Sequence, residues 1–85
     1  MARGTVRFWA AAKEAAGVAE EPFEALTLGD LVAQITLKYE KSDLPRVVAR
    51  SSFLVNGDPA GTRDLRTITL PEGATVEILP PFAGG

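Results

Sequence analysis

The segment that constrains the fold most lies near the middle of the chain, where apolar residues recur at helical spacing. These residues are Leu28, Leu31, Val32, Ile35 and Tyr39. Thr27 precedes them as a candidate N-cap, and Asp30 stands where a capping-box acid belongs. The spacing predicts a main helix over residues 28–40 with one apolar stripe, which must be buried against a sheet or another helix.

Strand-like segments lie on both sides of this helix. Residues 5–9 and residues 75–79 alternate apolar and polar side chains, as half-buried strands do. Residues 21–26 form a weaker strand that Pro22, which has no backbone N–H, confines to a sheet edge. Residues 52–55 form a further short strand. The chain therefore supplies strands before and after the main helix.

Three shorter elements complete the pattern. Residues 10–16 are rich in alanine and are followed by Gly17, which predicts a short helix that stops there. A second short helix is predicted for residues 44–50, which carry a proline in their first turn. Asn56-Gly57 predicts a tight turn, and a short strand is expected near residues 60–61.

The order of these elements predicts an α+β domain in which one mixed sheet packs on one main helix. If the first and last strands pair, they lie parallel in the middle of the sheet, because the chain between them is long enough for a crossover. We expect one domain over residues 1–80 and a flexible C-terminal tail over residues 81–85.

Two missing residue types restrict the chemistry. The 85 residues include no Cys and no His. Disulfides, thiolate nucleophiles and the usual zinc ligands are therefore absent from the sequence, and we expect no metal site. A carboxylate-only enzyme stays open as an alternative, but it needs a larger substrate cleft than such a chain easily builds. We expect a protein that is not a stand-alone enzyme.

Charge and hydropathy restrict the partners and the location. The net charge is −2, from 9 basic and 11 acidic residues that are scattered along the chain. No basic face is evident, so we expect no nucleic-acid binding. No apolar run approaches the roughly 20 residues that a membrane helix needs. The first residues do not resemble a signal peptide, and we expect a cytoplasmic protein.

The C-terminal residues are the candidate site. Gly85 ends the sequence, and its carboxylate is the predicted reacting group. Glycine has no Cβ, so Gly84 and Gly85 fit a channel too narrow for any side chain. The residues predicted to enter a partner's active site with it are Pro81, Phe82, Ala83 and Gly84. The alternative is that Gly-Gly is a frayed end without a role.

The whole chain resembles the small subunit of molybdopterin synthase, a ubiquitin-like sulfur-carrier family. The closing stretch is the most specific part of this likeness. The segments that carry it are Val6–Ala10, Lys13–Gly17, Thr27–Leu31, Val55–Gly57 and Pro71–Gly85.

The resemblance implies a ubiquitin-like β-grasp fold and a sulfur-carrier role. In that family, an adenylating enzyme of the ubiquitin-activating type uses ATP to activate the terminal glycine, here Gly85. Sulfur then converts the carboxylate to a thiocarboxylate. The large synthase subunit takes the tail into its active site, where sulfur passes to cyclic pyranopterin monophosphate. The resemblance implies no cofactor bound by the carrier itself.

The same residues leave other functions open. Related carriers serve thiamine or cysteine synthesis, and related modifiers are joined through the terminal glycine to a lysine of a target protein. A small interaction module without any tail chemistry is the remaining alternative. Lys13 stands where the family often has Arg, and Phe82 stands where a smaller apolar residue is common. Lys is not equivalent to Arg at a bidentate contact, so a family contact at that position is not carried over to Lys13.

Candidate partner contacts are Trp9, Lys13 and Phe82. Trp is enriched at binding hot spots, but Trp9 also fits a role in closing the core or packing on a neighbouring strand. Phe82 follows the last strand, where its own domain offers little cover. Phe53 is expected in the core.

Overall fold

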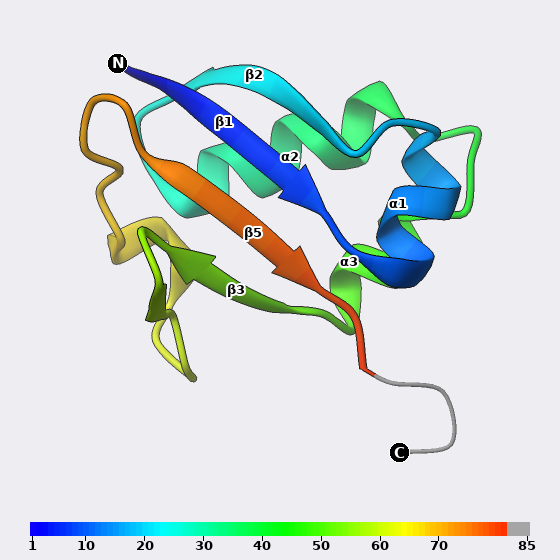
Figure 1. Ribbon diagram of the computed structural model, residues 1–85. Coiled ribbons are helices and arrows are strands. Elements are labelled where there is room, and N and C mark those ends of the chain that lie inside the picture. The colour runs from blue at the N-terminus through cyan, green and yellow to red at the C-terminus, as the bar shows by residue number, and fades with distance from the viewer. Residues whose placement is uncertain (82–85) are drawn as a thin grey trace.

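The computed structural model describes residues 1–81 and shows a five-stranded sheet with helices packed against one of its faces (Figure 1). In chain order the elements are β1 (Ala2–Phe8), α1 (Ala10–Ala16), β2 (Glu20–Ala25), α2 (Leu28–Lys38), α3 (Leu44–Ala49), β3 (Ser52–Val55), β4 (Asp58–Pro59), the 3₁₀ helix η1 (Leu65–Thr67) and β5 (Thr75–Leu79). No helix within residues 1–81 combines the length and apolar character needed to cross a bilayer.

The sheet has the strand order β2-β1-β5-β3-β4. β1 and β5 lie side by side in its centre and run parallel, with Thr5 opposite Thr75 and Phe8 opposite Ile78. The remaining strand pairs are antiparallel. The predicted parallel pairing of the first and last strands and the predicted edge position of β2 are both confirmed.

Alternation along the central strands separates the core from solvent. Val6 and Phe8 of β1 are buried, while Arg7 between them is exposed. Val76 and Ile78 of β5 are buried in the same way. These side chains face the helices, so the core lies between the sheet and α2.

The main helix forms as predicted. The Thr27 side chain accepts a hydrogen bond from the Asp30 backbone N–H at 3.1 Å, which satisfies one of the free donors at the start of α2. Leu28, Leu31 and Ile35 are buried against the sheet. α2 ends at Lys38, two residues before the predicted end.

The predicted strand near residues 60–61 is wrong in position. Asn56 and Gly57 have φ values of 50° and 85° and form the whole turn. Val55 therefore pairs at once with Asp58, and Leu54 pairs with Pro59. A two-residue turn brings the chain back immediately, so β4 has to begin at Asp58.

The bounds of the first strand also differ from those predicted. β1 begins at Ala2, because Ala2 pairs with Ala25 at the far end of β2. It ends at Phe8 rather than Trp9. Trp9 is the N-cap of α1, and the chain leaves the sheet through Ala10, whose φ is 49°.

A polar cluster ties the edge strand β2 to the end of α2. The Tyr39 hydroxyl donates to Glu21, and Lys38 Nζ lies 2.7 Å from the other oxygen of that carboxylate. Burial, with the neighbouring Glu21 carboxylate, raises the pKa of Tyr39 to about 12. The protonated phenol is therefore favoured in the folded state.

This pKa shift predicts how stability responds to alkaline pH. Below pH 10.0 the phenol is protonated in both states, and the contribution to stability is fully present. Between pH 10.0 and about 12 the unfolded chain loses the proton first, so the free energy of unfolding should fall with a steeper slope than in Tyr39→Phe. Urea midpoints across this range measure the effect. Tyr39 is the only tyrosine, so Tyr39→Phe removes the whole phenol titration. Equal slopes in the two proteins would contradict the expectation.

Candidate functional site

The carboxyl ends of the two central strands meet at one edge of the sheet, because β1 and β5 are parallel. The Trp9 backbone N–H, just past β1, donates to the Ile78 carbonyl of β5 at 3.2 Å. Pro80 is buried and Pro81 is exposed. The chain therefore leaves the sheet after Leu79, and Pro81 shares a hollow with Ala10 and Ala11 at the start of α1.

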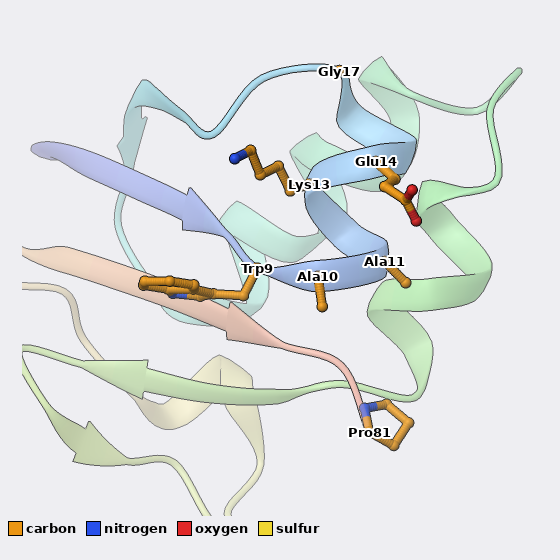
Figure 2. A pocket seen from close by; sticks show the side chains of 7 residues that line it. All are labelled: Trp9, Ala10, Ala11, Lys13, Glu14, Gly17 and Pro81. Atoms are coloured by element: carbon orange, nitrogen blue, oxygen red, sulfur yellow. The ribbon is translucent and has the colours of Figure 1, made fainter. Parts of the chain in front are cut away.

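An open hollow, the exit hollow, lies where the chain leaves the sheet. Figure 2 shows the residues that line it: Trp9, Ala10, Ala11, Lys13, Glu14, Gly17 and Pro81. The methyl groups of Ala10 and Ala11 point from α1 to the side on which Pro81 lies. The small side chains of Ala10 and Ala11 leave this part of the hollow open and apolar.

Ala10 adopts a backbone conformation that L-residues rarely take. Its φ of 49° lies in the left-handed region. For a residue with a Cβ this costs roughly 1–2 kcal/mol. This strained conformation lies at the corner between Trp9 and α1, which borders the exit hollow. Residues with such backbone strain cluster at active sites, ligand clamps and switch regions.

Basic side chains stand on the other side of Pro81. A second hollow is lined by Ala11, Asp43, Arg46, Val47, Arg50, Pro80 and Pro81. Arg46 Nε lies 3.7 Å from the Asp43 carboxylate, and both side chains are largely exposed. Lys13 also lines the exit hollow, but Figure 2 shows its side chain extending away from Pro81. The basic residues that share the second hollow with Pro81 are Arg46 and Arg50.

Trp9 is exposed but held in place. Its side chain is 40% exposed and its Nε1–H donates to Glu77 Oε1 at 3.0 Å. The Arg7 guanidinium carbon lies 4.8 Å from the ring centroid, a cation–π contact. Of the alternatives for Trp9, closing the core is wrong, because the indole extends along the outer side of β5 (Figure 2).

The groups with displaced pKa values lie away from both hollows. Besides Tyr39, they are Asp64, the N-cap of η1, and Arg66 within η1. Hydrogen bonds from Arg66 lower the pKa of the Asp64 carboxyl, and the same pairing raises the pKa of the Arg66 guanidinium. In the part of the chain that the structure describes, no three carboxylates group together as metal ligands would.

The structure brings together three of the residues singled out from the sequence. Trp9, Lys13 and Pro81 line the same hollow, although they come from two ends of the chain. Phe53 is buried, which confirms its predicted place in the core. The predicted site residues Phe82, Ala83, Gly84 and Gly85 lie outside the described residues.

Sequence reasoning missed three residues of this region. Nothing in the sequence indicates that Ala10 adopts a left-handed conformation. Nothing indicates either that Arg46 lines the same hollow as Pro81. Alternation along β5 did place Glu77 on the opposite face from Val76 and Ile78. It gave no indication that Glu77 meets Trp9, which is 68 positions away.

A mixed sheet with a central parallel pair, covered on one face by a main helix, defines the class of the protein as a ubiquitin-like β-grasp domain. Residues 6–85 match the model of the ThiS family, and the chain belongs to that family.

Similar solved structures include carriers and modifiers. The small archaeal modifier protein 1 of Methanosarcina acetivorans is 26% identical, with a TM-score of 0.84 over 100% of this chain and 98% of that one. In Helicobacter pylori, the complex of subunits 1 and 2 of molybdopterin-converting factor contains a chain that is 26% identical, with a TM-score of 0.70 over 98% of this chain and 99% of that one.

A third similar structure supports the fold alone. The Haloferax volcanii small archaeal modifier protein 1 is 20% identical, with a TM-score of 0.79 over 98% of this chain and 99% of that one. No curated protein matches the sequence significantly. The fold and family are therefore those of ubiquitin-like sulfur carriers and modifiers.

Proposed function

We propose that this protein is a sulfur carrier for molybdopterin synthesis and acts as the small subunit of molybdopterin synthase. The observation that carries the proposal is the family match, which runs through the Gly-Gly end of the chain. The Helicobacter pylori neighbour, which was solved together with subunit 2 of its converting factor, supports a large-subunit partner.

The reacting group in this proposal is the Gly85 carboxylate. A C-terminal carboxylate has a pKa near 3.5, so it is charged at neutral pH and is a poor electrophile. An adenylating enzyme activates it: a carboxylate oxygen attacks the α-phosphorus of ATP and pyrophosphate leaves. Sulfide, or the terminal sulfur of a persulfide, then forms the C–S bond as the C–O bond to AMP breaks. In the persulfide case a second thiol reduces the S–S bond of the resulting acyl disulfide and forms a disulfide with the donor sulfur. The product is the Gly85 thiocarboxylate.

The fold around Pro81 is suited to presenting such a group. Pro80 is buried at the end of the central strand β5, which gives the tail a rigid base. The four residues after Pro81 span at most about 14 Å when extended. A partner that receives Gly85 must therefore also approach Pro81, and the exit hollow with Trp9 and Lys13 is the surface that it meets there.

A second candidate function is that of a ubiquitin-like modifier. The structural likeness to the Methanosarcina acetivorans modifier favours it. In this case the activated Gly85 carbonyl is attacked by a lysine amine of a target protein, an isopeptide bond forms and AMP leaves. Both functions share the activated terminus and differ in the nucleophile.

Co-expression with the adenylating enzyme and the large synthase subunit of the same genome tests the proposal. We expect an intact mass in which one oxygen is replaced by one sulfur, and co-purification of the large subunit. High-mass conjugates on immunoblots, without the sulfur-containing species, would support the modifier instead. Co-purification of an enzyme of thiamine or cysteine synthesis in place of the large subunit would assign the carrier to that pathway instead.

A further inference from the structure

A half-buried carboxylate on the outer face of the sheet has no counter-ion among the residues that the structure describes. Glu77 lies in the middle of β5, with its side chain on the face opposite the helices. Among residues 1–81, no basic nitrogen lies within ion-pairing distance of it. Within these residues its charge is met by a hydrogen bond from Trp9 and not by a cation.

The other carboxylates on this face are paired. Glu24 lies 3.1 Å from Arg3 Nε, and Glu20 lies 3.7 Å from Arg7 Nε. Arg7 sits directly opposite Glu77 in the parallel register of β1 and β5, yet its ion pair is with Glu20. The arginine that could neutralise Glu77 thus covers the Trp9 ring and pairs with the edge strand.

The Glu77 carboxylate is oriented by one hydrogen bond and has capacity to accept more. Its Oε1 accepts the hydrogen bond from Trp9, and within the described part of the chain no hydrogen bond to Oε2 is found. Leu54 of β3 lies opposite Glu77 on the other side, and it is half-buried. The carboxylate therefore stands between an indole and a leucine with one oxygen available. An ionised carboxylate can accept several donors.

We propose that Glu77 receives an arginine of the protein that takes up the tail. The charge is complementary, and a guanidinium bonds a carboxylate through planar, paired N–H groups while its stem and flat face pack against aromatic and aliphatic side chains. Glu77 lies on β5, the strand that leads to the tail, four residues before Pro81. The identity of that partner rests on the proposed function, whereas the arginine site is a property of the sheet face.

A titration of the isotope-labelled full chain with N-acetyl-L-arginine amide tests the site without any partner. Trp9 is the only tryptophan, so the single indole N–H signal in a nitrogen–proton NMR spectrum reports on Glu77 directly. We expect a saturable shift of this signal in the wild type. In Glu77→Gln, which keeps an oxygen acceptor for the indole but removes the charge, apparent affinity should fall about tenfold.

The matched control is Glu24→Gln, which removes the same charge from a paired carboxylate on the same sheet face. It should bind the probe as the wild type does, and N-acetyl-norleucine amide should cause no shift. No saturable shift in the wild type, or equal weakening in the two variants, overturns the arginine site. Failure of sulfur loading with an intact titration overturns the proposed function and leaves the site standing.

Discussion

Deleting Gly85 is expected to abolish formation of the sulfur-containing species. Co-expression with the adenylating enzyme should leave only the unmodified mass of the shortened chain. The physical reason is reach: each residue of extended chain spans about 3.5 Å, and activation needs the carboxylate within bonding distance of the α-phosphorus of ATP. In the shortened chain the carboxylate ends one residue short of this position. The tail cannot be lengthened by drawing residues out of the domain, because Pro80 is buried there. Intact mass spectrometry measures the loss.

The fold should not depend on that residue. The last strand ends at Leu79, six positions before Gly85, so the urea midpoint and the near-ultraviolet circular dichroism should match those of the wild type. Unfolding of the shortened chain would make the loss of sulfur uninformative. Persistence of the mass shift in a folded, shortened chain would mean that the reacting carbonyl lies elsewhere, and the proposed function would be wrong.

Gly4→Ala is expected to destabilise the sheet strongly. A Cβ at Gly4 would lie 2.2 Å from the Ala74 carbonyl oxygen and 2.8 Å from Cζ of Phe23. The oxygen cannot retreat freely, because it accepts a hydrogen bond from the Thr5 N–H at 2.9 Å. Overpacking against backbone should lower the free energy of unfolding by roughly 3 kcal/mol, a large part of the margin of a small domain. Urea unfolding measures the loss.

Gly61→Ala is the matched control for this substitution. Gly61 has a φ of 62°, and a Cβ there would meet nothing within 4 Å. Its cost therefore comes from backbone conformation alone, which is about 1 kcal/mol. If the two variants lost the same stability, the close approach of Gly4 to Ala74 would not be the limiting contact.

The parts of the fold that were predictable are those coded by local periodicity. The stripe from Leu28 to Tyr39 indicated α2, and the alternation in residues 75–79 indicated β5 with Val76 and Ile78 buried. Pro22 indicated an edge strand. These signals survive in the sequence because each element buries one face, and burial selects apolar residues at the period of that element.

The sequence-based predictions were wrong where strand pairing, rather than local periodicity, determines where a strand begins or ends. β4 begins at Asp58 because the two-residue turn returns the chain at once, and β1 extends back to Ala2 because β2 is long enough to pair with it. Nothing in the sequence around Gly4 indicates that the backbone of Ala74 lies too close for a Cβ at this position. Such contacts join positions far apart in the chain, so no window of sequence contains them.

The sequence by itself determined the three α-helices, the strands other than β4, and the glycine terminus expected to carry the chemistry. It left the parallel central pairing conditional on the first and last strands meeting. The tertiary structure alone decided which residues surround the exit of the tail: Trp9 with Lys13 and Pro81, and Glu77 held by an indole from the other end of the chain. The reason is that residue type and spacing fix local conformation, whereas the neighbours of a side chain follow from strand register and from the angle at which α1 leaves the sheet.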